Sequence, residues 1–268
     1  RIPASEVELF EPDETDERVR TRLLGLSGNA CCAVSATTQA ELDRFAGLVL
    51  EAGSAGKRFL FRSAASLLTS LAGLPPQPVG AQEMGRYVPS ERPGLVVVGS
   101  HVPMSTQQLA RLLESRSAPR GRLAPIELNV GLLPDTTGAV TEQTGARLAQ
   151  ALEQGYDVAL FTSRTERTFE TAEARLAFGI EISRVLMTVI RNAPTTLGFV
   201  LSKGGITSND VIRTGLALAA VRVVGQIHPG CSVVLTPEDH RHGSIPVVIF
   251  PGNVGDEEAL RLVYERLT

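Results

Sequence analysis

The feature that most constrains the fold is a regular alternation of short apolar segments with helical segments, which begins at residue 95. Apolar runs of strand length lie at 95–99, 125–130, 157–162, 196–202, 221–225 and 245–250, and helical periodicity follows at 105–115, 139–154, 170–192, 208–218 and 256–267. This order predicts βαβ units, because parallel neighbours need a crossover over one face of the sheet. We expect an α/β fold with a mainly parallel sheet and helices on both faces, an open three-layer sandwich.

The chain before residue 95 follows a less regular pattern. Its periodicity predicts helices at 14–25, 38–52 and 66–72 and strands at 30–35 and 58–62. Residues 73–94 are rich in proline and glycine and show little periodicity, which indicates a linker or a domain-edge loop. We therefore expect two domains, residues 1–90 and residues 91–268.

Composition excludes several classes of function. The net charge of -3 and the lack of a Lys/Arg stripe argue against a nucleic-acid partner. No apolar run approaches the roughly 20 residues of a membrane span. The three cysteines form neither a disulfide framework nor a CxxC pair, and no signal peptide is visible, so we expect a cytoplasmic protein. Because the chain begins with Arg1 and not with methionine, we expect a processed, truncated or partial product.

A glycine-rich turn directly follows the predicted strand at 196–202. It reads Lys-Gly-Gly-Ile-Thr-Ser over residues 203–208 and opens a helix. Glycine lets the backbone approach a ligand closely, the first amides of a helix have no acceptor within it, and Lys203 adds positive charge. The turn therefore predicts a binding site for an anion, most simply a phosphate.

Three other strand ends carry unusual residues. Ser100 follows the strand at 95–99, where its hydroxyl either meets a ligand or bonds its own turn, and Ser105 or Thr106 is expected to cap the next helix. Arg164 follows the strand at 157–162, either to bind phosphate or as a solvated loop residue. The turn at 251–255 carries two glycines and precedes Asp256, a candidate N-cap. An open parallel sheet could gather these turns at one edge.

Several familiar site patterns are missing from the sequence. There is no GxxxxGK[ST] and no GxGxxG after a strand, which excludes a Walker-type loop and a standard dinucleotide fingerprint. No GxSxG supports a serine hydrolase. The four histidines lack the spacing of metal ligands, and Cys231 reads as a small turn or core residue. We therefore expect no metal site built from side chains of this chain, and the sequence assigns no catalytic residue.

Six motifs nevertheless occur in an order that resembles a known family. They are Gly99-Ser100, Thr106-Gln107-Gln108-Leu109, Thr162-Ser163-Arg164, Lys203 to Ser208, Gly225 to Gly230, and Phe250 to Gly255. This order is similar to the nucleotide-binding C-terminal domain of the four-carbon acid sugar kinases, and residues 56–66 resemble the later part of that family's sugar-binding domain. Members phosphorylate threonate, erythronate or 3-oxo-tetronate with ATP.

The resemblance implies ATP as cofactor together with Mg²⁺ and a small sugar acid as substrate. ATP would be held by Ser100, Gly204, Gly205, Ile206, Thr207, Ser208, Gly252, Asn253 and Gly255. The Asp-Asp-x-Thr-Gly motif near the start of family members is not found here, and Asp210 and Asp256 are better explained as helix-dipole partners or Mg²⁺-side groups than as a base. Two alternatives remain: a non-catalytic nucleotide or sugar-phosphate binding module, and a scaffold for interactions. A homodimer is a possible assembly.

Overall fold

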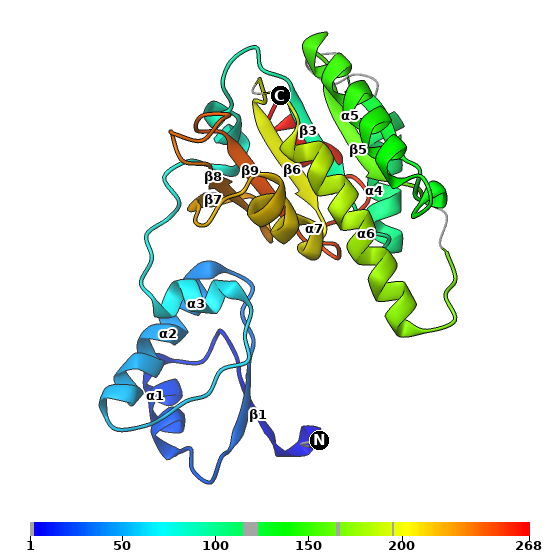
Figure 1. Cartoon of the computed structure of the whole chain (residues 1–268). Helices are drawn as coiled ribbons and strands as arrows, with labels where there is room; N and C mark the ends of the chain where they lie inside the picture. Colours follow the sequence, from blue (N-terminus) through cyan, green and yellow to red (C-terminus); the bar gives the residue numbers. More distant parts are fainter. Residues whose placement is uncertain (1–2, 115–122, 165–166, 195) are drawn as a thin grey trace. The chain divides into compact units, whose positions relative to one another are not determined.

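The computed structural model describes residues 3–114, 123–164, 167–194 and 196–268. The chain divides into two compact units, Arg1–Pro76 and Gln77–Thr268, which are coloured from blue to cyan and from cyan to red in Figure 1. Each unit has its own hydrophobic core and is described by itself.

A seven-stranded sheet forms the centre of the larger unit in the described part of the chain. Its order is β4-β5-β3-β6-β9-β8-β7. The bounds are β3 Gly94–Val98, β4 Leu123–Leu128, β5 Asp157–Thr162, β6 Phe199–Lys203, β7 Arg222–His228, β8 Cys231–Leu235 and β9 Pro246–Phe250. The first five strands in this order are parallel, whereas β8 pairs antiparallel with both β9 and β7. The expected mainly parallel α/β sheet is confirmed.

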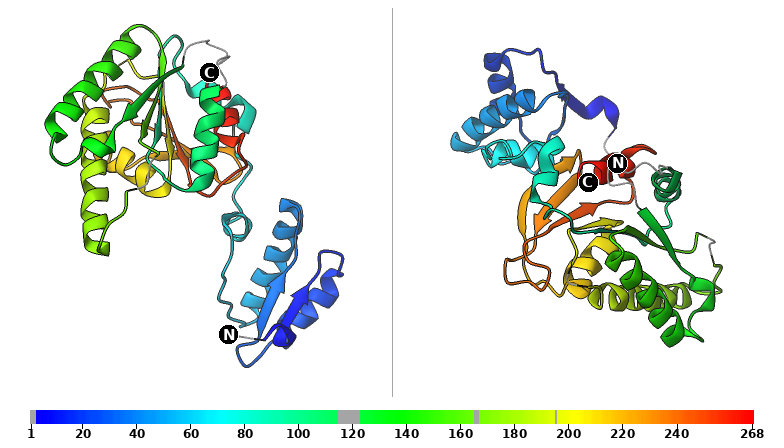
Figure 2. Two further views of the ribbon diagram at one scale, coloured as in Figure 1. Left: turned by 90° about the vertical axis from the view of Figure 1, so that its right-hand side faces the viewer. Right: turned by 90° about the horizontal axis from the view of Figure 1, so that it is seen from above.

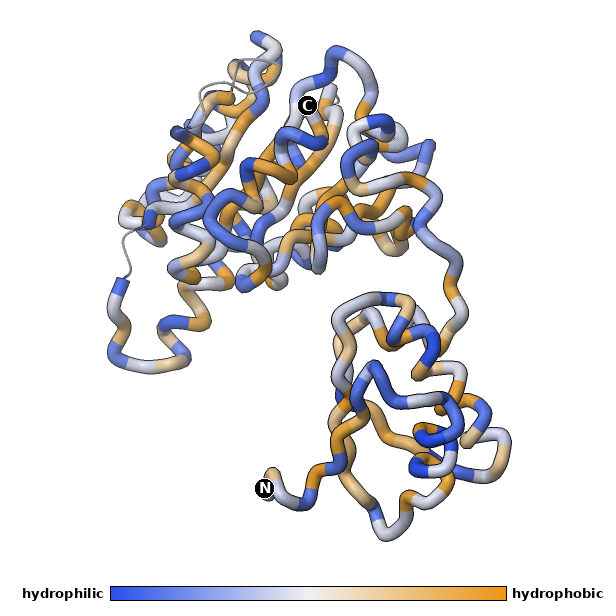
Figure 3. The backbone as a smooth tube through the Cα atoms, turned by 180° about the vertical axis from the view of Figure 1, so that it is seen from behind, coloured by the Kyte–Doolittle hydropathy of each residue, from blue (hydrophilic) through white to orange (hydrophobic). Residues whose placement is uncertain are grey.

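Helices cover both faces of this sheet, as the left view of Figure 2 shows. The helices α5 Thr137–Glu153 and α6 Ala172–Arg191 lie on one side of the strands, and α4 Pro103–Glu114 and α8 Ala259–Glu265 lie on the other. Side chains alternate accordingly: Leu95 and Val97 of β3 pack in the first layer, and Val96 and Val98 pack in the second. All of β3 is buried, because a parallel strand between two helical layers meets water on neither face. Figure 3 shows the apolar colour that runs along these strands.

The first residues of the larger unit are more structured than their proline- and glycine-rich composition predicts. Residues Ala81–Tyr87 form the 3-10 helix η2, whose Met84 is fully buried in the core beneath α4 and α8. Gln77 also belongs to the larger unit, since its side chain accepts a hydrogen bond of 2.7 Å from the amide of Gln226. The proline-rich stretch is therefore in part a packed element of the larger unit.

The smaller unit is built on two parallel strands, β1 Val7–Phe10 and β2 Cys31–Val34, with the 3-10 helix η1 Ala4–Glu6 before them. The helices α1 Asp16–Gly25, α2 Gln39–Ser54 and α3 Ala65–Leu71 accompany these strands. Phe10, Val19, Leu23, Leu48, Val49 and Ala52 make its core. Thr38 caps α2 in a capping box with Glu41, which satisfies amides at the helix start.

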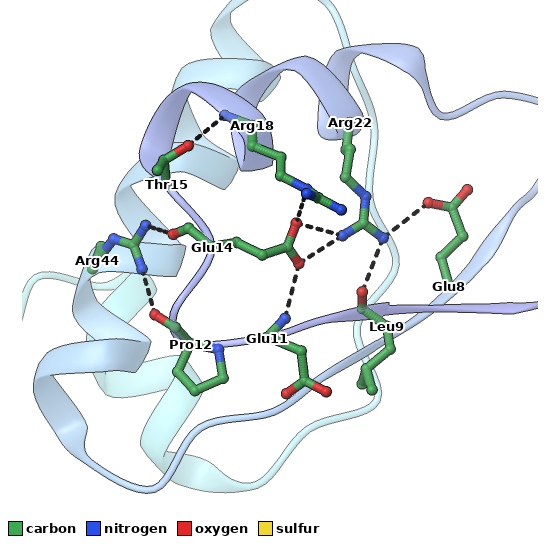
Figure 4. Close-up of polar contacts among 9 residues, drawn as sticks. All are labelled: Glu8, Leu9, Glu11, Pro12, Glu14, Thr15, Arg18, Arg22 and Arg44. Carbon is green, nitrogen blue, oxygen red and sulfur yellow. Dashed lines mark hydrogen bonds and ion pairs between the residues drawn. The ribbon is translucent and has the colours of Figure 1, made fainter.

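A polar cluster follows β1 in the smaller unit (Figure 4). The Glu14 carboxylate accepts hydrogen bonds from the Glu11 amide at 3.0 Å and from Arg22 Nη1 at 2.6 Å. The bond from the Glu11 amide and the bond from Arg22 hold the pKa of Glu14 below its ordinary value. Arg44 donates to the carbonyl of Pro12 at 2.9 Å, so the loop between β1 and α1 is tied to α2.

Some expected elements differ in the structure. Residues 58–62 form no strand, and the Leu60 side chain is fully exposed, because β1 and β2 pair with each other and not with this segment. The expected strand at 221–225 is β7, which extends to His228 and is followed by a turn into β8. Neither β8 nor β1 is predicted from the sequence pattern. The helix expected at 208–218 begins at Gly205 as α7 Gly205–Asp210 and continues as a π-helical turn, Val211–Gly215. No helix in the described part of the chain combines the length and apolar character that crossing a membrane requires.

Candidate functional site

A cavity of about 400 Å³ opens at the carboxyl ends of the central strands of the larger unit. Turns after β3, β6 and β9 line it, and these three strands are neighbours in the sheet, with Val98 paired to Lys203 and Lys203 paired to Phe250. The lining residues are Gly99, Ser100, His101, Val102, Gly204, Gly205, Ile206, Thr207 and Gly252 from the turns, with Gly179, Ile182, Ser183, Leu186 and Met187 of α6 and Asp210 of α7. Open parallel sheets bind ligands at this edge.

Glycines are required where the turns approach one another. A Cβ atom at Gly99 would lie 2.6 Å from Thr207 Oγ1, and one at Gly252 would lie 3.3 Å from Ser100 Oγ. Gly204 adopts φ 114, which a side chain rarely permits, and its Cβ would lie 3.1 Å from that of Ser100. The three turns therefore pack against each other as one wall.

Gly205 has a different role from these packing glycines. It lines the cavity, and a Cβ built there would meet no atom within 4 Å. A side chain at this position would enter the open space of the cavity. Gly205 is also the first residue of α7, where amides have no acceptor within the helix. This is the geometry in which bare backbone can face a bulky anion.

Ser100 is bound into the wall through Ser105. Ser105 Oγ lies 3.1 Å from Ser100 Oγ and 3.3 Å from the carbonyl oxygen of Gly252. The expectation that Ser105 or Thr106 caps the helix is wrong, because α4 begins at Pro103 and its third residue, Ser105, is fully buried. Proline is favoured in the first turn of a helix, because an amide hydrogen at that position would have no acceptor within the helix and proline has none.

The structure also corrects the interpretation of Lys203. Its side chain is fully buried and does not line the cavity. Nζ donates a hydrogen bond of 2.7 Å to the carbonyl of Pro251 and lies 4.0 Å from the centroid of the Phe250 ring. Burial lowers the pKa of Lys203 to about 8. Lys203 therefore acts on the turn after β9 and presents no ammonium group to the cavity.

Arg164 fits neither of the two interpretations that the sequence left open. Its Nη1 donates to the carbonyl of Ser100 at 2.7 Å, and its Nη2 donates to Thr162 Oγ1 at 2.6 Å. Desolvation lowers the pKa of this guanidinium, which is half-buried. Arg164 joins the ends of β3 and β5 and does not line the cavity, so it is a structural residue in this arrangement.

The half of the cavity that faces α6 is mainly apolar. Ile182, Leu186 and Met187 form this side, and the exposed Val102 and Ile206 of the turns also line the cavity. One polar pair interrupts it, because Ser183 Oγ donates a hydrogen bond of 2.6 Å to Asp210 Oδ2. Asp210 closes α7 at its C-terminal end, so the expectation that it is a partner of the dipole at a helix start is wrong. Sequence reasoning missed the α6 wall because helix periodicity does not reveal which turns a helix will face.

Six of the nine predicted nucleotide-contacting residues lie together on the cavity wall: Ser100, Gly204, Gly205, Ile206, Thr207 and Gly252. The other three lie elsewhere. Ser208 is buried and its hydroxyl donates to the carbonyl of Ser202 at 2.9 Å. Gly255, at φ 76, abuts Ala259 at the start of α8, and neither it nor Asn253 lines the cavity.

No histidine contributes to a metal centre in the described residues, where no group of three His, Cys, Asp or Glu side chains could hold an ion. His101 lines the cavity and its Nε2 lies 3.2 Å from Thr162 Oγ1. His240 Nε2 lies 3.0 Å from the carbonyl of Leu216. Asp256 lies outside the cavity, where its Oδ1 accepts a hydrogen bond of 3.1 Å from the amide of Glu258 ahead of α8.

The residues that line the cavity fit a nucleotide. A glycine whose Cβ would fill open space leaves room for a phosphate group beside the backbone, and the adjoining apolar half suits a flat, weakly polar ring. The two halves are continuous in one cavity, as the two ends of a nucleotide require.

Solved structures share this fold at low sequence identity. A Bordetella bronchiseptica protein, described as a domain of unknown function (DUF1537) in a domain-swapped dimer with bound citrate, is 19% identical, with a TM-score of 0.52 over 97% of this chain and 58% of that one. A putative tRNA synthase from Salmonella typhimurium LT2 is 21% identical, with a TM-score of 0.56 over 97% and 58%. A Haemophilus influenzae protein of the DUF1537 family is 16% identical, with a TM-score of 0.56 over 98% and 61%. The chain thus spans about six-tenths of the length of these proteins.

Two family models match the chain in succession. The model described as a sugar-binding N-terminal domain matches residues 1–71, and the model described as a nucleotide-binding C-terminal domain matches residues 95–260. No curated protein matches the chain significantly. The second match covers the strands, the glycine turns and the cavity described above. The chain therefore belongs to the DUF1537, or four-carbon acid sugar kinase, family, with its sugar-binding and nucleotide-binding domains.

Proposed function

We propose that the protein is an ATP-dependent kinase, or the nucleotide-binding portion of one, that phosphorylates a four-carbon sugar acid such as threonate, erythronate or 3-oxo-tetronate. The observation that carries this proposal is the convergence of glycine turns from β3, β6 and β9 on one cavity, with open space beside Gly205. The match of residues 95–260 to a nucleotide-binding domain supports the donor, and the match of residues 1–71 to a sugar-binding domain supports the acceptor class.

In this proposal the two halves of the cavity take the two ends of the nucleotide. The turn at Gly204–Thr207, with Ser100 and Gly252, receives the phosphates through backbone amides and hydroxyl groups. The apolar face of α6 receives the base. Mg²⁺, carried with ATP, supplies charge neutralisation at the phosphates, on which phosphoryl transfer largely depends. In the transfer, the bond between the γ-phosphorus and the bridging oxygen to the β-phosphate breaks, a bond from the sugar-acid hydroxyl oxygen to that phosphorus forms, and the products are the phosphorylated acid, ADP and the released hydroxyl proton.

Two properties of the Bordetella protein support finer parts of the proposal. Its citrate is a carboxylate ligand, which agrees in chemistry with a sugar acid as substrate, and its domain-swapped dimer supports a homodimer here. A cytoplasmic location agrees with the use of ATP and with the few cysteines.

Calorimetry with ATP in the presence and absence of Mg²⁺ tests the first step. The second step is ADP release from Mg·ATP with each of the three sugar acids, measured for this chain and for the full-length gene product. Binding with turnover supports the kinase. Binding without turnover of any acid by the full-length product favours the alternative, a non-catalytic nucleotide or sugar-phosphate binding module. Lack of any nucleotide binding would overturn both and leave a scaffold for interactions.

A further inference from the structure

The turn that carries Gly252 is held by side chains from two other elements of the larger unit. Lys203 Nζ, at the end of β6, donates to the carbonyl of Pro251 at 2.7 Å. Gln108 Nε2, on α4, donates to the carbonyls of Val254 at 3.0 Å and Asp256 at 2.6 Å. Three carbonyl groups within six residues of backbone are thus fixed by two side chains.

Both side chains are fully buried, and the burial of each costs free energy of folding. A buried ammonium group loses its hydration, and a buried amide oxygen without a partner costs stability. Gln108 Oε1 has no hydrogen-bond partner among the described residues. An apolar side chain of similar volume would avoid both costs, so packing alone does not account for Lys203 and Gln108.

We propose that Lys203 and Gln108 are positioning residues that clamp the turn Pro251–Asp256 and so hold Gly252 against Ser100 at the wall of the cavity. The distance of 3.3 Å between a Cβ built at Gly252 and Ser100 Oγ shows how small a displacement of the turn would alter this wall. The link to nucleotide binding rests on the proposed function, whereas the clamp itself does not.

The titration of Lys203 gives the clamp a pH signature. The groups that face it are Phe250, the Pro251 carbonyl and Cys231 of β8, whose pKa burial raises to about 12, and His228 of β7 stacks on Phe250 with ring centroids 6.3 Å apart. Because burial lowers the Lys203 pKa to about 8, the charge-assisted bond to Pro251 weakens as pH rises through that value. The burial penalty has the opposite sign: Lys203 costs stability below pH 8, and this cost falls as pH rises from about 8 towards the ordinary value of 10.5.

The sequence offers a matched control, because it contains only two lysines, Lys57 and Lys203. Lys57 Nζ makes the same kind of bond, at 2.7 Å to the carbonyl of Leu26, but in the smaller unit. Lys203→Met, Gln108→Met and Lys57→Met are compared by hydrogen exchange of the amides of residues 252–256 and by ATP affinity. We expect faster exchange in this turn and at least about tenfold weaker ATP binding for the first two variants, and no change in either for Lys57→Met.

A second measurement uses the unaltered protein, in case the variants fold poorly. Expression with ¹³C-labelled lysine gives NMR signals for the side chains of the two lysines without modifying them, and their titration is compared with ATP affinity between pH 7 and 9.5. We expect the ATP affinity to fall over the same pH range in which the Lys203 signal titrates. Unchanged exchange in both variants, or an affinity that ignores the Lys203 titration, would overturn the proposal. If the unaltered protein binds no ATP, the proposed function fails, and the exchange experiment still decides whether the clamp exists.

Discussion

Ser183 Oγ donates a hydrogen bond of 2.6 Å to Asp210 Oδ2 and so joins α6 to the end of α7 at the cavity wall. Asp210 is the one carboxylate among the described residues that line this cavity. A negative charge beside a site for phosphates repels the bare anion but attracts a cation that accompanies it. The pair therefore makes the response to Mg²⁺ a sharp test of what the cavity binds.

Asp210→Asn should change the affinity for ATP in opposite directions with and without Mg²⁺. Without the metal, removal of a like charge should tighten ATP binding by about threefold to tenfold, and with Mg²⁺ the variant should bind more weakly than the unaltered protein. Calorimetry in EDTA and in Mg²⁺ measures both. Asp239→Asn, at an exposed position of the larger unit outside the cavity, is the control and should change neither value. Equal shifts under both conditions would show that Asp210 does not act through charge.

Gly205→Val should abolish nucleotide binding and leave the protein folded. The added side chain meets no protein atom within 4 Å of its Cβ, so it fills the cavity without disturbing the turns. Circular dichroism and thermal unfolding check the fold, and calorimetry checks binding. Gly138→Val, in α5, has equally open surroundings outside the cavity and should bind ATP normally. Unchanged ATP affinity for Gly205→Val would remove the phosphate role of this turn.

Gly99→Ala should destabilise the larger unit, in contrast to Gly205→Val. Its Cβ would lie 2.6 Å from Thr207 Oγ1, so the turns after β3 and β6 would have to separate. Overpacking of this kind costs about 1–3 kcal/mol. Urea unfolding measures the loss, and Thr207→Ser, which keeps the hydroxyl, serves as the comparison. A stability equal to that of the unaltered protein would show that the two turns are not in close contact.

Ser100→Ala should weaken ATP binding by about 0.5–1.5 kcal/mol, the value of one neutral hydrogen bond. Ser100 lines the cavity, and its hydroxyl oxygen accepts hydrogen bonds from Ser105 Oγ at 3.1 Å and from the Val102 amide at 3.4 Å. Titration calorimetry of the variant beside Ser54→Ala, whose hydroxyl bonds Leu50 within α2, separates this effect from a general loss of stability. An affinity within error of the unaltered protein would remove Ser100 from the phosphate-binding wall.

Glu14→Gln should destabilise the smaller unit at neutral pH and lose this effect in acid. The Glu11 amide and Arg22 lower the Glu14 pKa, so the ionised carboxylate stabilises the fold above its ordinary value of 4.5, and the stabilisation is lost as pH falls through the lowered value. We expect a loss of about 1–2 kcal/mol at pH 7. Thermal unfolding from pH 7 to pH 2.5, with Glu17→Gln in the adjoining helix α1 as control, measures it. A pH-independent difference would contradict the role of the charge.

Much of the larger unit follows from local sequence. The strand at Asp157–Thr162 has the predicted bounds, and the other parallel strands lie within a few residues of theirs, because a fully buried strand needs a short, continuous apolar run. The glycines after β3, β6 and β9 follow from the same pattern, since a parallel sheet turns into its helices at the carboxyl ends of its strands. The strand β7 is predicted only in part, since a largely exposed strand carries a weak apolar signal. The buried strand β8 is missed because it follows β7 after a short turn, without the helix that the βα alternation predicts.

By itself the sequence determined the class of fold and the glycine turns that could approach an anion, because both depend on periodicity and on residues that lie close together in the chain. Only the tertiary structure decided what each side chain does there. The pairing of β6 with β9 turns Lys203 inward to Pro251, the packing of α6 supplies the apolar wall, and the start of α7 at Gly205 places Asp210 beside Ser183. These relationships join residues far apart in the chain, and their physical cause is the order and register of the strands, which local propensity does not encode.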